Sequence, residues 1–239
     1  MSTVAALNSD FDRRAAVHAS RAPWVPSPAP GVERKMLDRI GAEVARATSI
    51  VRYAAGSEFA PHVHGGGEEF LVLEGVFQDE AGDYPSGWYV RNPPTSRHRP
   101  GSAAGCTILV KLWQFDPTDR TPVRIDTAQG AYLPEPGRPG VARQPLYRGF
   151  GETVALERWS PAAEIRLEVP GGLELLVLQG DCRIDGESFE SHDWLRLPPG
   201  APLVARAGAG GCRLWLKSGH LAGVTAGAVQ ERLAAAGRA

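Results

Sequence analysis

The strongest constraint on the fold is an internal repeat with an offset of about 105 residues. Residues 68–75 read EEFLVLEG, and residues 173–180 read LELLVLQG. The register continues downstream, where Arg91 and the two prolines that follow it match Arg196 and its own prolines. Self-similarity of this extent indicates two copies of one structural unit. We therefore predict a duplicated domain.

Short β-rich runs separated by turn residues fill the first copy. The chain between Thr48 and Phe115 alternates runs such as TSIVRY, EEFLVLEG and CTILVKLW with segments rich in Gly and Pro. The runs FLVL and CTILVKLW are apolar at consecutive positions, so both faces of these strands are expected to be covered. We predict an all-β fold of two tandem domains, each a barrel or a sandwich.

The repeat also gives expected domain boundaries. We predict an extended N-terminal arm over residues 1–34, a first β domain over 35–128, a Pro/Gly-rich linker over 129–144, a second β domain over 145–220 and an Ala-rich C-terminal tail over 221–239. The tail is expected to form either a short helix or a frayed end.

Composition excludes two classes of partner. Lys and Arg number 26 against 27 Asp and Glu, and no basic run is present, so we expect no nucleic-acid binding. The longest apolar stretches are four residues, far from the roughly 20 that a membrane helix needs, so we expect no membrane association. The N-terminus lacks a signal-peptide pattern, and the three cysteines form no CxxC pair. We therefore expect a cytoplasmic protein.

Three of the six histidines and one glutamate form a candidate metal site. His62 and His64 are two residues apart, so on a strand they present both imidazoles to one face. Gly65–Gly67 then allows a reversal of the chain, after which the carboxylate of Glu68 can turn back toward them. A later turn delivers His98. Three imidazoles and one carboxylate suit a divalent transition metal with open coordination positions.

Charged residues around these ligands allow two interpretations. Glu69 alternates with Glu68 along the strand, so we expect it to be a charge on the outer face, with a role in supporting the ligands as the alternative. Arg91 and Arg97 could orient an anionic ligand at the mouth of the site, or form solvated salt bridges.

These residues resemble the two metal-binding motifs of the cupin superfamily. The first motif is matched at every spacing by Gly56, His62, His64, Glu68 and Gly75, and the second is matched by Gly87, Pro93 and His98. Thr95 and Ser102 replace a Gly and an Asn of the second motif, which affects the turn and not the ligands. The wider segment 62–94 is similar to the cupin domain of ChrR-type anti-sigma factors.

The resemblance implies two tandem cupin (jelly-roll) barrels, of which the C-terminal copy lacks metal ligands. Leu173 stands where the repeat would place Glu68, and Leu203 stands where it would place His98. We expect side chains to fill this second barrel, which would then be structural.

The resemblance also implies one divalent metal, with zinc or iron first and manganese, nickel or cobalt next. Dioxygenase-like chemistry on a small molecule or an oxidant is the leading expectation, and no catalytic residue beyond the ligands is assigned. A non-enzymatic zinc sensor in an oxidative-stress response and a small-ligand binding module remain as alternatives. No cysteine precedes Cys106, so the sigma-binding zinc domain of the family is not expected, nor is direct sigma-factor binding. Cupins commonly form homodimers, which is an expectation from the resemblance alone.

Overall fold

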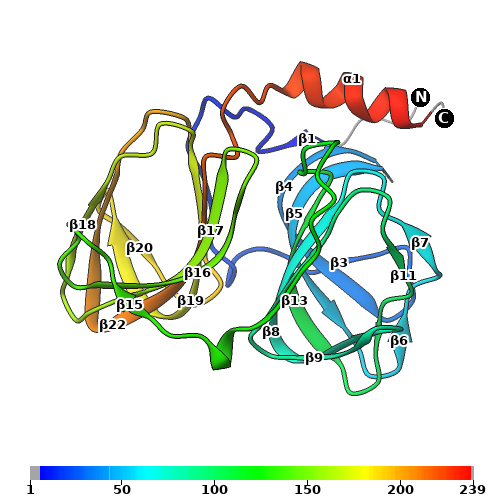
Figure 1. Ribbon diagram of the computed structural model, residues 1–239, viewed down its shortest axis with the longest axis horizontal. Coiled ribbons are helices and arrows are strands. Elements are labelled where there is room, and N and C mark those ends of the chain that lie inside the picture. The colour runs from blue at the N-terminus through cyan, green and yellow to red at the C-terminus, as the bar shows by residue number, and fades with distance from the viewer. Residues whose placement is uncertain (1–5, 43, 238–239) are drawn as a thin grey trace. The chain divides into compact units, whose positions relative to one another are not determined.

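The computed structural model describes residues 6–42 and 44–237, and their regular secondary structure is almost entirely β-strand, with one α-helix (Figure 1). They divide into two compact units, one within Met1–Ser9, Pro23–Gln129 and Ala226–Ala239, the other formed by Asp10–Ala22 and Gly130–Thr225. This confirms the all-β prediction. No helix among the described residues is long and apolar enough to cross a lipid bilayer.

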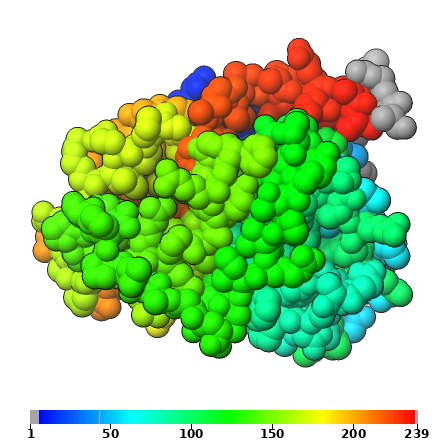
Figure 2. All heavy atoms as spheres, viewed as in Figure 1, coloured from blue at the N-terminus to red at the C-terminus, as the bar shows by residue number. Residues whose placement is uncertain are grey.

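The first unit is built on a sheet with the strand order β1-β4-β5-β13-β8-β10-β14. Its elements are β1 (Ala6–Leu7), β3 (Val25–Pro26), β4 (Val32–Gly41), β5 (Ala45–Tyr53), β6 (Ser57–Glu58), β7 (His62–Val63), β8 (Glu68–Asp79), β9 (Gly82–Pro85), β10 (Trp88–Asn92), β11 (Arg97–His98), β12 (Gly101–Ser102), β13 (Cys106–Leu112), β14 (Val123–Asp126), η1 (Thr127–Gln129) and α1 (Ala226–Ala236). The strands β11 and β7 form a separate two-stranded ribbon. The helix α1 contacts β4 and β5 and buries Leu233, while most of its surface faces solvent (Figure 2).

The second unit has the strand order β15-β16-β17-β22-β19-β21-β2. Its strands are β2 (Ala15–Val17), β15 (Leu133–Pro134), β16 (Val141–Gly149), β17 (Glu152–Trp159), β18 (Glu164–Leu167), β19 (Leu173–Ile184), β20 (Glu187–Phe189), β21 (Trp194–Leu197) and β22 (Leu203–Ser218). Residues 15–17, which the sequence analysis placed in an N-terminal arm, therefore supply the edge strand of this sheet. A strand of three residues is too short to give a periodic signal in the sequence.

Strand pairing repeats between the units with the offset seen in the sequence. In the first unit Leu112 pairs with Glu68 and Cys106 pairs with Tyr53. In the second unit Ser218 pairs with Leu173 and Cys212 pairs with Trp159. Each unit thus places a long strand, β8 or β19, against the same neighbours in the same register, as expected for two copies of one jelly-roll-like fold.

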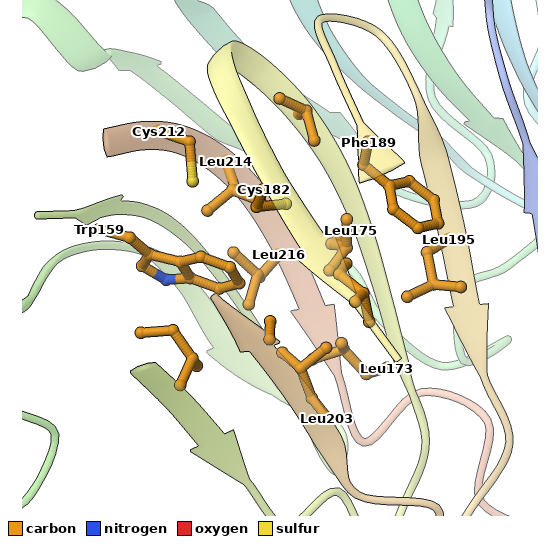
Figure 3. Close-up of a cluster of buried hydrophobic side chains, with 14 of the residues drawn as sticks. Trp159, Leu173, Leu175, Cys182, Phe189, Leu195, Leu203, Cys212, Leu214 and Leu216 are labelled. Carbon is orange, nitrogen blue, oxygen red and sulfur yellow. The ribbon is translucent and has the colours of Figure 1, made fainter. Parts of the chain in front are cut away.

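Apolar side chains fill the interior of the second unit (Figure 3). Leu173 and Leu203 are fully buried in this cluster, and Phe189, Leu195 and Leu214 pack in it as well. The first unit has its own core, centred on Phe70, Phe77, Val90 and Ile108. The positions that correspond to Glu68 and His98 are therefore occupied by packed leucines in the second unit.

A buried ion network lies on the other face of the first sheet. Glu69 accepts hydrogen bonds from the hydroxyl of Tyr89 at 2.8 Å and from Arg91 at 3.2 Å, and Arg91 also contacts Asp119 at 3.1 Å. Glu69 and Arg91 are each only 1% exposed, so Glu69 is not the outer-face charge that the sequence suggested. Strand alternation assigns the face of a residue but does not show what covers that face. The repeat-equivalent Glu174 is likewise fully buried.

Candidate metal centre

Two short segments and the start of a long strand position four potential ligands. His62 lies on β7, and His98 lies on β11, where it is the antiparallel partner of His62. His64 follows β7 directly, and Glu68 is the first residue of β8. The structure thus brings together the four residues that the sequence analysis singled out, and they form a group that could hold a metal ion.

The distances within this group fit the ligands of a single ion. The Nε2 atoms of His64 and His98 are 3.1 Å apart, and Oε2 of Glu68 is 3.4 Å from each of them. Metal–nitrogen bonds of about 2.0–2.1 Å separate two ligand atoms by about 2.9 Å at a right angle and by about 3.3 Å at a tetrahedral angle. One ligand atom from each of the four residues lies within 4.8 Å of the others. Three imidazoles and a carboxylate are therefore arranged as a mononuclear divalent-metal site requires.

Hydrogen bonds orient the rings of His62 and His64. Nδ1 of His62 lies 3.0 Å from the carbonyl oxygen of Ala60 and donates to it. Nδ1 of His64 lies 3.0 Å from Oγ of Ser96, whose own hydroxyl donates to the carbonyl of Pro93 at 2.6 Å. Because that hydroxyl is already a donor, its oxygen accepts the Nδ1 proton of His64. Both rings are thereby left with a free Nε2 lone pair for a metal.

Asp79 orients the ring of His98 through a hydrogen bond to Nδ1. Nδ1 of His98 donates to Oδ2 of Asp79 at 3.2 Å, and Asp79 also accepts from the amide of Ala81 and the hydroxyl of Tyr84. The fourth ligand is held in a similar way, since the side-chain amide of Asn92 donates to Glu68 at 3.1 Å. A second layer of polar side chains therefore supports the candidate ligands.

Burial and these hydrogen bonds shift the pKa values at the site. Burial lowers the pKa of His64, which favours the neutral imidazole that binds metals. Burial also disfavours the charged form of His98, but the hydrogen bond to Asp79 and the charge of Glu68 outweigh it and raise the pKa of His98. Burial acts to raise the pKa of Asp79 as well, yet the hydrogen bond from His98 leaves it below its ordinary value. Asp79 is therefore an ionised acceptor at neutral pH.

The glycine loop that joins His64 to Glu68 is packed against aromatic rings. A Cβ atom on Gly66 would lie 2.3–2.6 Å from the ring of Trp113, and one on Gly67 would lie 2.4 Å from the ring of Phe115. The amide of Trp113 donates to the carbonyl of Gly67 at 3.0 Å. Trp113 has a φ of 61°, a conformation that is rare for a large side chain. Glycines are thus needed here for close approach as well as for the turn.

A pocket of about 530 Å³ opens beside the site. It is lined by Pro61, His62, Val63, Asp79, Glu80, Ala81, Asn92, Ser96, Arg97, His98 and Arg124. Since His62 and His98 are among the lining residues, a metal bound by them would face the pocket. Arg97 lines it, as the sequence allowed. Arg91 does not, because it is buried between Glu69 and Asp119.

Sequence reasoning missed the residues that orient the ligands. Asp79, Ser96 and Asn92 are separated from their partners by 19, 32 and 24 residues respectively. No local spacing connects them to the histidines. A general rule that metal-binding histidines donate their second nitrogen to an acceptor could have prompted a search for them, without identifying the residues.

Comparisons with known proteins agree with this description. Residues 12–116 match a family model described as the ChrR Cupin-like domain. No curated protein sequence matches the chain. Similar solved structures include a candidate dioxygenase from Nostoc punctiforme, with 14% identity, 91% of this chain and 86% of the other covered, and a TM-score of 0.67.

Two further solved structures, a pirin and an oxalate decarboxylase, have a similar fold. The Escherichia coli pirin YhhW in complex with nickel(II) has 13% identity, 86% and 98% coverage and a TM-score of 0.58. A variant of oxalate decarboxylase from Bacillus subtilis has 12% identity, 92% and 79% coverage and a TM-score of 0.60. Identities at this level show similarity of fold. Over residues 12–116, which include the four clustered residues, the chain is similar to the ChrR Cupin-like domain.

Proposed function

We propose that this chain is a metal-dependent cupin that uses one divalent ion for dioxygenase-type chemistry on a small molecule. The observation that supports this most is the convergence of His62, His64, Glu68 and His98 at the wall of a pocket. Two of the histidines face that pocket, so a small molecule inside it could reach the ion directly. Similarity in fold to a candidate dioxygenase is consistent with the proposal.

Iron is the metal that suits this proposal best, with manganese, nickel or cobalt as substitutes. When bound, the ion supplies Lewis acidity and, if it is redox-active, electron exchange with dioxygen. The neutral Nε2 atoms and the single carboxylate of Glu68 form a borderline donor set that does not select one of these ions by itself.

The surrounding residues prepare the site for such chemistry. Asp79 and Ser96 hold His98 and His64 in the tautomer that leaves Nε2 free, and Asn92 fixes one oxygen of Glu68. His64, Glu68 and His98 are buried, so solvent reaches the ligands from the side of His62. A preformed arrangement reduces the reorganisation needed when a ligand binds.

The second unit is, in this proposal, structural. Leu173 and Leu203 stand at the repeat positions of Glu68 and His98 and are buried in an apolar core. An apolar, filled interior offers a metal no ligands. We therefore expect one equivalent of metal per chain.

A zinc-dependent sensor without turnover is the second candidate. The match of residues 12–116 to the ChrR Cupin-like domain favours this candidate, since the matched segment contains all four candidate metal ligands. In this case an oxidant or small ligand would alter the metal coordination and the chain would pass the change to a partner protein. A simple binding module for a small molecule would differ from both by having no response to dioxygen or oxidants.

Elemental analysis of untagged protein is the test that separates these functions. One equivalent of iron, together with metal-dependent oxygen consumption on a panel of small diketones, is the expected result. The variant His98→Ala should lose the metal and the activity, while His192→Asn, which alters a histidine of the second unit, should lose neither. Full metal binding by His98→Ala would refute the ligand assignment. Stoichiometric zinc without oxygen consumption would favour the sensor.

A further inference from the structure

We propose that the pocket beside the metal centre binds a small organic carboxylate, whose charged group is held by Arg97 and Arg124. This inference rests on the proposed function, because it places the other end of the ligand at the metal. It adds the chemical class of the ligand, which neither the fold nor the metal ligands specify.

Two guanidinium groups line the pocket with unused hydrogen-bonding capacity. Arg97 lies on β11, next to the ligand His98, and makes no hydrogen bond or ion pair with any described residue. Arg124 lies on β14 and uses only its Nε, which donates to the hydroxyl of Tyr84 at 3.0 Å. Within the described part of the chain its two terminal nitrogens have no partner. Both side chains are exposed to solvent, so an incoming ligand can reach them.

The acidic groups of the pocket, in contrast, are already occupied. Asp79 accepts hydrogen bonds from His98, Tyr84 and the amide of Ala81. Glu80 accepts from the amide of Arg99 at 2.9 Å. With a divalent ion in place, four positive charges, two of them on arginines, face the three carboxylates of Glu68, Asp79 and Glu80. The pocket therefore favours an anion over a neutral or cationic ligand.

Arg124 is also oriented by a hydrogen-bonded chain that ends at the metal ligand His98. Nε of Arg124 donates to Tyr84, the Tyr84 hydroxyl donates to Asp79 at 3.2 Å, and Asp79 accepts from His98 at 3.2 Å. Because Nε is fixed, the terminal nitrogens of the guanidinium have a restricted orientation before a ligand arrives. Such pre-organisation reduces the entropy that binding would otherwise lose.

These features favour a carboxylate over other anions. The planar fork of a guanidinium matches the two oxygens of a carboxylate, and such charge-assisted pairs are stronger than neutral hydrogen bonds. A volume of about 530 Å³ leaves room for a small organic acid that also presents a second oxygen to the ion. A short acid with an adjacent carbonyl group is therefore a suitable probe.

The test uses the full chain loaded with cobalt(II), whose visible absorption reports ligand binding at the metal. Cobalt content is first measured by elemental analysis. Pyruvate is then titrated in parallel with pyruvamide, which has nearly the same shape but no charge. We expect pyruvate to bind at least about tenfold more tightly, since a charge-assisted contact is lost in the amide.

Variants assign this preference to the two arginines. Arg97→Gln and Arg124→Gln should each weaken pyruvate binding by about tenfold, leave pyruvamide binding unchanged and retain full cobalt content. Arg99→Gln is the matched control, because Arg99 pairs with Glu58 and does not line this pocket, and it should bind pyruvate as the natural chain does.

The outcomes separate this inference from the metal assignment. Equal affinities for pyruvate and pyruvamide in cobalt-loaded protein, or unaltered pyruvate binding in both arginine variants, would overturn the carboxylate site while the metal site stands. Tighter binding of inorganic phosphate than of pyruvate would overturn the choice of a carboxylate. If cobalt does not load, the proposed function fails. Calorimetric titration of the metal-free chain with pyruvate then decides the inference, because loss of binding in Arg97→Gln and Arg124→Gln would support the anion site and its retention would refute it.

Discussion

At the scale of single residues, Asp79 shows how one side chain can orient a candidate metal ligand, His98, without belonging to the candidate ligand set itself. Its carboxylate fixes the Nδ1 proton of His98, which leaves Nε2 available, and its lowered pKa keeps it an acceptor at neutral pH. Partners of this kind typically contribute 10–100-fold to metal affinity.

Asp79→Ala should therefore lower metal affinity by about 10–100-fold, measured by competition with a chromogenic chelator. Asp79→Asn should have a smaller effect, because an amide oxygen can still accept from His98. Asp83→Asn is the control, since Asp83 pairs with Gln78 near the same turn and does not contact a ligand. Unchanged metal affinity in Asp79→Ala would show that the hydrogen bond has no positioning role.

At the scale of elements, the glycine loop depends on its close packing against aromatic rings. The loop lies against Trp113, and a side chain at Gly66 has no room. Gly66→Ala should lower both metal affinity and stability, the latter by about 1–3 kcal/mol, because the ring or the loop must move. Gly210→Ala, where a Cβ would meet nothing within 4 Å, is the matched control. Normal chelator competition and a normal melting temperature in Gly66→Ala would argue against a fixed loop.

Besides the pairing of β2 with β21, the side chain of His18 holds the segment that contains β2 to the second unit. The ring of His18 lies 2.8 Å from a carboxylate oxygen of Asp193 and 2.8 Å from one of Glu187, and these hydrogen bonds raise the pKa of His18. A raised pKa means that the folded state binds the proton more tightly, so the stabilisation is complete below the ordinary value of 6.5 and is lost as pH rises through the higher folded value. The hydrogen bond to His18 lowers the pKa of Glu187. The stabilisation that ionised Glu187 contributes is therefore lost only as pH falls below about 4.5.

His18→Gln should therefore destabilise the chain most between pH 4.5 and 6.5 and least above neutral pH. We expect a loss of about 1–2 kcal/mol at pH 6, for hydrogen bonds between charged groups, visible as a lower melting temperature in calorimetry. Arg21→Gln, an exposed change in the same segment, should show no such pH dependence. A constant difference between His18→Gln and the natural chain from pH 5 to 9 would contradict this account.

At the scale of the whole molecule, the sequence predicted what depends on local spacing and repetition. The candidate ligands His62, His64, Glu68 and His98 follow a fixed spacing, and the duplicated run at 68–75 and 173–180 marks β8 and β19. Other features depend on distant partners. Asp79 meets His98 only because β8 is long, and the three residues of β2 find their place only on the edge of another sheet. Pairings of this kind leave no periodic signal in one sequence.

Metal binding should stabilise the chain through the first unit. A ligand that binds only the folded state at 100 times its Kd contributes about 2.7 kcal/mol. Saturating metal should therefore raise the melting temperature of the natural chain, and a chelator should reverse the increase. His98→Ala should show no increase, whereas Leu203→Ala, which shortens a core side chain of the second unit, should lower the starting melting temperature and retain the metal-dependent gain. A metal-dependent gain in His98→Ala would place the binding site elsewhere.

The contact between Trp113 and the glycine loop also gives the protein an internal optical probe. The indole ring lies against Gly65 and Gly66, directly after the candidate ligand His64, so it is close to any ion held there. Paramagnetic ions such as cobalt(II) quench the fluorescence of a nearby indole, whereas zinc leaves it largely intact. The emission of this one tryptophan, obtained as the difference from Trp113→Phe, would therefore distinguish both the occupancy of the site and the type of metal without an added label.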